Sequence, residues 1–106
     1  MKVIWSDFAT DSLHDIYKYY KEAAGENVAQ RIKSRIFSAT RNIKRHPESG
    51  QIEPVLKQLG ENHRYLVEGN YKIIYRKVTE GILIADVFDT RQDPVKMSAI
   101  KMKPRR

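Results

Sequence analysis

Apolar residues in the first half of the chain recur every three or four positions, in two separate series. The first series follows Ser6 and Asp7, which are typical of a helix N-cap and an acidic first turn, and it ends at Gly25. Its apolar members are Ala9, Leu13, Ile16, Tyr20 and Ala23, with Tyr17 and Ala24 beside them. This spacing predicts an amphipathic helix that ends at Gly25.

The second series runs from about Glu26 to His46. Its apolar members are Val28, Ile32, Ile36, Ala39 and Ile43, with Phe37 beside them. The predicted helix ends at His46, because Pro47 disfavours helical geometry in the residue before it. Two amphipathic helices joined by a short glycine turn are expected to pack as an antiparallel pair.

The rest of the chain contains short runs of β-type residues. They predict strands at Lys2–Trp5, Arg64–Glu68, Tyr71–Val78 and Ile82–Phe88. Gly69-Asn70 and Glu80-Gly81 are expected to form the tight turns between the last three strands. The segment 47–62, with two prolines and two glycines, is interpreted as mostly loop.

These elements predict a single α+β domain over residues 1–106, in the order β-α-α-β-β-β. The helix hairpin is expected to cover one face of a small, mainly antiparallel twisted sheet and to leave the other face partly open. Alternation along the second of the three strands sorts its side chains to two faces: Tyr71, Ile73 and Tyr75 on one, Lys72, Ile74 and Arg76 on the other. Residues 95–106 form a basic C-terminal tail, in which Met97, Ile100 and Met102 are candidates for docking on the fold.

The chain carries 20 Lys and Arg residues against 13 Asp and Glu residues, a net charge of +7 at pH 7. This excess favours an anionic partner, which is a nucleic acid, an acidic protein or an acidic membrane face. The segment 28–47 contains no acidic residue, and its basic residues are Arg31, Lys33, Arg35, Arg41, Lys44 and Arg45. A basic helix of this kind is either a nucleic-acid footprint or a solvated face, and the layout of a helix-turn-helix is missing.

Cysteine is absent, which excludes disulfide and thiolate chemistry and fits a reducing cytosol. The longest aliphatic run, Ile82–Ala85, is far shorter than the ~20 residues that span a bilayer. The opening residues 1–6 lack the apolar core of a signal peptide. The protein is therefore expected to be cytoplasmic and to have no membrane partner.

No common catalytic signature occurs, neither a glycine-rich phosphate loop nor a nucleophile elbow. Metal ligands normally come in spaced clusters, whereas His14, His46 and His63 are scattered, so neither a metal nor a cofactor is expected. His14 is interpreted as a solvated helix residue and His46 as a cation that favours a helix C-terminus. Of the three histidines, only His63, beside Arg64, is a candidate functional residue.

Four basic residues are the main candidates for binding a target: Arg64, Lys72, Arg76 and Arg91. Such side chains hold phosphates or acidic groups, and beside a scissile phosphate they stabilise developing charge. The alternative is a structural one. Arg64 and Arg91 would then tie the end of the sheet together through Asp86, Asp89 or Asp93, while Lys72 and Arg76 would be solvated.

Several short motifs follow one another through nearly the whole chain. They are Val-Ile-Trp-Ser at 3–6, Ala9 with Leu13-x-x-Ile16-Tyr17, His46-Pro47-x-x-Gly50, Arg64-x-Leu66, Tyr71-Lys72-Ile73-Ile74-Tyr75-Arg76, and Val87 through Arg91-Gln92-Asp93-Pro94. Together their order and spacing resemble the RelE/ParE superfamily of bacterial type II toxins. The resemblance implies a plasmid-stabilisation toxin that arrests growth. It also implies a cognate antitoxin, whose tail wraps the helix pair and the sheet in a hetero-oligomer.

The superfamily contains two mechanisms. RelE-like members resemble ribosome-dependent nucleases that cleave messenger RNA with basic residues on the open sheet face and an aromatic residue near the C-terminus. The resemblance places Lys72 and Arg91 at their arginine positions but puts Met97 where RelE has a tyrosine, and a thioether cannot transfer a proton. As a nuclease, the chain would hold the phosphate with Lys72 and Arg91 and would have only His63 as a proton carrier.

The Trp5-Ser6 opening and the ending at 91–94 look more like ParE members, which resemble inhibitors that trap the gyrase–DNA intermediate without cutting nucleic acid themselves. We favour this interpretation, in which Arg64, Lys72, Arg76 and Arg91 form an electropositive end of the sheet. A RelE-like endoribonuclease is the alternative, and a general nucleic-acid-binding module is a third class. His63 or a tyrosine hydroxyl beside the Arg91 guanidinium, in an accessible hollow, would contradict the non-catalytic interpretation.

Overall fold

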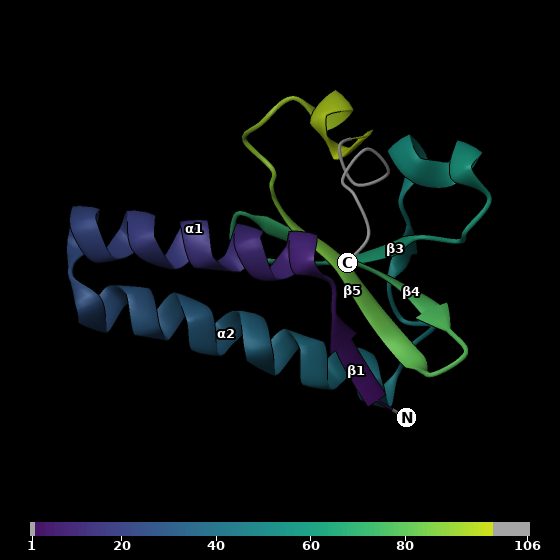
Figure 1. The fold of residues 1–106 in the computed structure, drawn as a ribbon, viewed down its shortest axis with the longest axis horizontal. Coiled ribbons are helices and arrows are strands. Elements are labelled where there is room, and N and C mark those ends of the chain that lie inside the picture. The colour runs from purple at the N-terminus through teal and green to yellow at the C-terminus, as the bar shows by residue number, and fades with distance from the viewer. Residues whose placement is uncertain (1, 99–106) are drawn as a thin grey trace.

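The computed structural model describes residues 2–98, in which two long helices pack on a five-stranded sheet (Figure 1). The elements are β1 (Lys2–Trp5), α1 (Asp7–Ala24), α2 (Glu26–Arg45), β2 (Gln51–Ile52), β3 (Arg64–Glu68), β4 (Tyr71–Val78) and β5 (Gly81–Asp89), with the 3-10 helices η1 (Pro54–Leu59) and η2 (Pro94–Ser98). The end of the predicted basic tail, including Ile100 and Met102, lies outside the described residues.

The strands are ordered β1-β5-β4-β3-β2 across the sheet. The outer strand β1 is parallel to β5, and each other neighbouring pair is antiparallel. Strand β4 is therefore central. The predicted fold, a helix hairpin on one face of a mainly antiparallel sheet, is confirmed.

Local signals determine the bounds of the helix hairpin. The Ser6 hydroxyl accepts a hydrogen bond from the Ala9 amide at 2.9 Å, which caps α1, and donates to the Ala85 carbonyl at 3.1 Å, which ties the cap to β5. Gly25, with φ of 95°, separates the two helices, as predicted. Figure 1 shows the hairpin extending beyond the strands at this turn. Within residues 2–98, no helix is long and apolar enough to cross a membrane.

Each face of the sheet carries a buried cluster of side chains. The face toward the helices holds the larger cluster, in which Tyr71, Ile73 and Tyr75 of β4 contact α1 and α2 side chains. Ile74 belongs to a second cluster on the opposite face, which η1 and η2 cover with residues such as Leu56 and Met97. The predicted alternation along β4 and the docking of Met97 are confirmed. The opposite face is open only in part.

The segment 47–62 is more regular than the loop that its prolines and glycines predicted. It contains β2, which pairs with β3, and η1, which begins at Pro54. The Glu53 carboxylate caps η1 by accepting a hydrogen bond from the Val55 amide at 2.9 Å. The fixed φ of proline suits the first turn of a helix, which is why Pro54 starts this element instead of preventing it.

The turn between β4 and β5 is displaced by one residue from its predicted position. Thr79 and Glu80 form it, and Gly81 is the first residue of β5. Gly81 has a φ of 150°, and a Cβ there would lie 2.8 Å from the Lys2 amide nitrogen. Glycine is needed at this position because β1 runs close beside it.

Strand β5 contains a β-bulge, and the residue after the bulge binds α1. Ala85 is the extra residue, because the pairing with β4 skips it between Ile84 and Asp86. The Asp86 carboxylate accepts hydrogen bonds from the Ser12 hydroxyl at 2.6 Å and from the Val87 amide at 2.8 Å. The bulge thereby turns Asp86 toward α1 and fixes the helix against the sheet.

The Tyr75 hydroxyl holds the loop between α2 and β2. It accepts a hydrogen bond from the Gly50 amide at 3.0 Å and donates to the Pro47 carbonyl at 2.8 Å. A Cβ at Gly50 would collide with this hydroxyl and would lie 2.8 Å from the Tyr65 carbonyl oxygen. The His46-Pro47-x-x-Gly50 motif and the tyrosine before Arg76 are thus two halves of one packing arrangement.

Tyr75→Phe is expected to lower the free energy of unfolding by about 1–3 kcal/mol, because it leaves buried backbone groups at Pro47 and Gly50 without their partner. Tyr65→Phe is the matched control. It removes a hydroxyl that bonds only to the exposed Gln51 at 3.2 Å, and it is expected to cost less than about 0.5 kcal/mol. Urea unfolding curves measure both changes. Equal destabilisation by the two substitutions would contradict this role of Tyr75.

Candidate functional site

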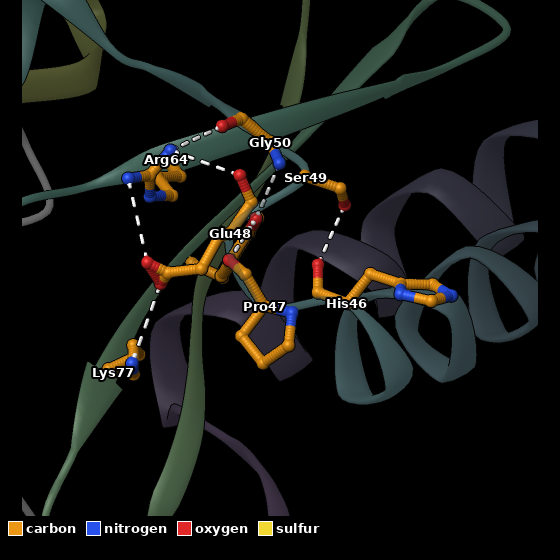
Figure 2. A network of polar contacts seen from close by, with 8 residues as sticks. His46, Pro47, Glu48, Ser49, Gly50, Arg64 and Lys77 are labelled. Atoms are coloured by element: carbon orange, nitrogen blue, oxygen red, sulfur yellow. Dashed lines mark hydrogen bonds and ion pairs between the residues drawn. The ribbon is translucent and has the colours of Figure 1, made fainter.

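Arg64, at the start of β3, binds the loop that follows α2 (Figure 2). Its guanidinium donates to the Gly50 carbonyl at 2.7 Å and to the Glu48 carbonyl at 3.4 Å, and it lies 3.9 Å from the Glu48 carboxylate. Lys77 of β4 approaches the same carboxylate to 3.4 Å. Arg64 therefore has a structural role, but its partners lie in the loop 46–50. The prediction that Arg64 pairs with Asp86, Asp89 or Asp93 is wrong.

Lys72 is bound by a carboxylate that the sequence analysis did not consider. Its ammonium group lies 2.7 Å from Glu53, a residue with no exposed surface. The same nitrogen lies 4.2 Å from the centre of the Tyr65 ring, within the range of a cation–π contact. Lys72 is thus neither solvated nor free. It neutralises a buried charge that would otherwise be costly.

His63, the residue before β3, lies near Arg76 of β4. His63 is 2% exposed, and its Nδ1 has no hydrogen-bond partner among residues 2–98. Burial lowers the pKa of His63. Arg76 also lowers this pKa, whereas Glu61 and Glu53 oppose the change. Arg76 is half-buried, and among the four predicted cations it alone has no ion pair within residues 2–98.

Arg91, just after β5, is paired with Asp89. Its Nε and Nη2 atoms donate to the two carboxylate oxygens at 2.9 and 2.8 Å, and its amide donates to the same carboxylate at 2.9 Å. These charge-assisted bonds lower the pKa of Asp89 and raise the pKa of Arg91. The structural interpretation, in which Arg91 ties the sheet end through an aspartate, is confirmed for Asp89.

Two tyrosines extend the Arg91–Asp89 pair toward α1. The Tyr20 side chain lies near the Arg91 guanidinium and contributes to raising the pKa of Arg91, after the larger effect of Asp89. The Tyr71 hydroxyl donates to the Tyr20 hydroxyl at 3.4 Å. Burial, and then the bond to Tyr20, raise the pKa of Tyr71. At neutral pH Tyr71 therefore stays protonated, so it donates hydrogen bonds and is a poor general base.

A hollow of about 820 Å³ lies between α1 and the segment that runs from the end of β5 into η2. Its charged lining consists of Asp15, Asp86, Asp89, Arg91 and Lys96. Its apolar lining includes Phe8, Ile16, Tyr19, Val87, Phe88 and Val95, of which Tyr19 and Val95 are 60% and 63% exposed. Three carboxylates against two cations disfavour a polyphosphate, whereas the apolar walls suit a polypeptide segment.

The structure does not gather the four predicted cations at one end of the sheet. Arg64 is opposite Tyr75 on β4, whereas Asp89, the partner of Arg91, is opposite Tyr71. These positions are four residues apart, or roughly 13 Å along the strand. Lys72 and Arg76 lie on the face away from the helices. A role in target binding stays a prediction for all four residues, but the cations do not form a single cluster.

The role of His63 as the proton carrier of a nuclease stays a prediction. His63 is buried beside β3, and it is Tyr20 of α1 that lies beside Arg91, which lines the hollow. Tyr20 is not among the residues that line the hollow, so this arrangement differs from the accessible tyrosine that a nuclease would need beside Arg91. Met97, at the position of the RelE tyrosine, is 1% exposed and packs in the core.

Sequence reasoning missed Glu53 and Tyr20 as parts of these clusters. Glu53 before Pro54 is a recognisable helix-cap signal, which predicts an ordered carboxylate but not its pairing with Lys72. Tyr20 was assigned to the core stripe of α1, and no local signal separates a buried tyrosine from one that reaches Arg91. Among residues 2–98, no group of three or more histidine or acidic side chains is arranged to hold a metal ion.

His63 is expected to make the folded protein less stable as the pH falls below about 6.5. The lowered pKa keeps the folded imidazole neutral while the unfolded one takes up a proton. Stability is therefore fully present above the unfolded pKa and is lost as the pH falls toward the folded pKa. His63→Gln should flatten the unfolding free energy between pH 7.5 and pH 5. His14→Gln, on the exposed side of α1, is the control, and an equal flattening by both variants would refute the assignment.

Lys72→Met is expected to cost about 3 kcal/mol of unfolding free energy, because it leaves the Glu53 carboxylate buried without its cation. The double variant Glu53→Gln/Lys72→Met removes both charges and should recover much of this loss. A double-mutant cycle from urea unfolding measures the coupling between the two residues. A stable Lys72→Met protein would show that Lys72 is a surface cation with no structural duty.

Comparisons with known proteins agree with this architecture. The family model described as "ParE toxin of type II toxin-antitoxin system, parDE" matches residues 3–94. A solved structure, "Chromosomal ParDE TA system from P. aeruginosa", is similar with a TM-score of 0.71 and 19% sequence identity, covering 84% of this chain and 95% of that chain. No curated protein sequence matches the chain. Because the family model spans most of the sequence, the chain belongs to the ParE toxin family of type II toxin-antitoxin systems.

Proposed function

We propose that this protein is a cytoplasmic toxin that inhibits DNA gyrase and is neutralised by a cognate antitoxin. The observation that carries the proposal is the match to the ParE toxin family over residues 3–94. ParE members resemble inhibitors that trap the gyrase–DNA intermediate, and for this reason we propose DNA gyrase as the target. An inhibitor of this kind needs a rigid binding surface and no catalytic group of its own.

The charges around Arg91 support binding over cleavage. The Arg91 guanidinium is already occupied by Asp89 on two nitrogens, and Asp15 and Asp86 add negative charge to the same hollow. A scissile phosphate would be repelled there. The raised pKa of Tyr71 and the lowered pKa of the buried His63 leave neither residue suited to the proton transfers of phosphodiester cleavage.

The hollow supports an antitoxin partner. Its apolar walls include Tyr19 and Val95, which are both more than half exposed. Burying such side chains against a partner is favourable by roughly 25 cal/mol for each Å² of apolar surface removed from water. We assign the hollow to a segment of the antitoxin, so the toxin and antitoxin form a hetero-oligomer.

One observation favours a second candidate function. The Tyr20 side chain near Arg91 is a candidate acid for a RelE-like ribosome-dependent endoribonuclease. Lys72 of β4, the other cation of that mechanism, is held by Glu53, the residue before η1. The nuclease hypothesis therefore depends on Tyr20 and Arg91, and substitution of either residue tests it.

The purified toxin is expected to inhibit gyrase supercoiling and to accumulate gyrase-linked DNA breaks, while leaving message intact on programmed ribosomes. Tyr20→Phe removes the hydroxyl beside Arg91 and keeps the ring, and it should leave gyrase inhibition within about twofold of wild type, since no proton transfer is lost. Tyr19→Phe, which changes the exposed neighbour, is the matched control.

Message cleavage that Tyr20→Phe or Arg91→Ala abolishes, with gyrase unaffected, would establish the nuclease instead. Urea unfolding of each variant is needed beside these assays, because Arg91 also binds Asp89. The antitoxin assignment is checked separately, by co-purifying the toxin with the product of the neighbouring open reading frame. Charge reversal at Lys96, on the rim of the hollow, should weaken that complex.

A further inference from the structure

One face of α2 carries a continuous stripe of exposed arginines: Arg31, Arg35, Arg41 and Arg45. At about 100° per residue these four positions fall within a sector of roughly 120°. The buried side chains of α2, Ala29, Ile36, Ala39 and Ile43, occupy the opposite side. Since no acidic residue occurs between positions 28 and 47, the whole exposed sector is cationic or neutral.

These four arginines do not stabilise the fold through ion pairs with other described residues, in contrast to Arg64, Lys72 and Arg91. Arg41 donates only to the Ser38 hydroxyl, at 2.8 Å. In Figure 1, α2 lies along the lower edge of the fold with α1 on its upper side. The cations are therefore available to a partner.

The composition of the face favours phosphates over a protein partner. Ser34, Ser38 and Asn42 share the exposed sector with the arginines, and all three are exposed. Protein interfaces are built around apolar or aromatic anchor residues. Within positions 2–98, the large hydrophobic side chains that are exposed all lie outside α2, so its exposed face offers no such anchor. Arginine with serine and asparagine is the set that contacts nucleic-acid backbones.

The shape of the face favours a duplex over a single strand. Arg31 and Arg45 are 14 residues apart on one straight helix, which is about 21 Å at 1.5 Å per residue. Along a DNA duplex this length corresponds to about six phosphates of each strand. Proteins that bind single strands stack bases on exposed aromatic rings, and the exposed sector of α2 carries none.

We propose that the arginine face of α2 binds the phosphate backbone of double-stranded DNA without reading its sequence. The choice of DNA rests on the proposed function, in which the target enzyme is itself bound to DNA. The contact would hold the toxin on the DNA segment next to gyrase. It uses a surface separate from the hollow between α1 and β5.

The test uses the full-length toxin and a short DNA duplex, without gyrase. Binding is measured by fluorescence anisotropy between 50 and 200 mM salt. The wild type is expected to show a log–log salt slope of about −3 to −4, since each neutralised phosphate contributes about −0.9. Arg31→Gln/Arg35→Gln should reduce the magnitude of the slope by about 2, because glutamine keeps the helix but removes two charges.

Lys18→Gln/Lys21→Gln removes two exposed cations from α1 and is the matched control, expected to keep the wild-type slope. An equal loss in the control would overturn the proposal, because net charge alone would then explain binding. So would tighter binding to polyglutamate or to single-stranded DNA than to the duplex, or no duplex binding at 50 mM salt. A gyrase supercoiling assay on the same samples separates this outcome from failure of the proposed target.

Discussion

Strand β4 is largely buried on both faces although it carries three cations, Lys72, Arg76 and Lys77, and much of the structure follows from this constraint. Its position in the middle of the sheet places Tyr71, Ile73 and Tyr75 under the helices and Ile74 under the 3-10 helices. A lysine in such a strand needs a carboxylate partner, because an unpaired charge in an apolar surrounding is costly. Glu53 supplies that partner, and its position requires the segment before η1 to be ordered against the sheet.

Within residues 2–98, the basic side chains fall into two groups: those that pair with a carboxylate and those that do not. The cations on or beside the sheet are mostly paired with carboxylates, since Arg64 reaches Glu48 and Arg91 reaches Asp89. The arginines on the exposed face of α2 form no such pair within residues 2–98. Within residues 2–98, the largest group of arginines without an ion pair therefore lies on a helix, and not on the strands where the motifs lie.

The fold could be predicted because its signals are local. Ser6, Gly25 and Pro47 set the ends of the helices, and Gly69-Asn70 sets the first hairpin, each through the conformation of a few neighbouring residues. The two-residue strand β2 and the 3-10 helix η1 are too short to leave a periodic pattern, so they were missed.

The candidate site was harder to predict, because its contacts join distant parts of the chain. Glu53 and Lys72 are 19 residues apart, and Tyr20 meets Arg91 only because α1 docks beside the end of β5. The identity of the basic residues could be read from the sequence, but whether each was paired or free depended on these tertiary contacts. A cation in a motif is thus a weak predictor of a binding site until its carboxylate neighbours are known.

The most direct measurement of how the toxin acts is made in cells that express the chain. DNA breaks and new 5′ ends of transcripts are mapped in the same growth-arrested culture. A gyrase inhibitor produces double-strand breaks with gyrase attached and leaves transcripts whole, and co-expression of the cognate antitoxin prevents both the breaks and the arrest. Transcripts cut in phase with codons, on an intact chromosome, would contradict the assignment.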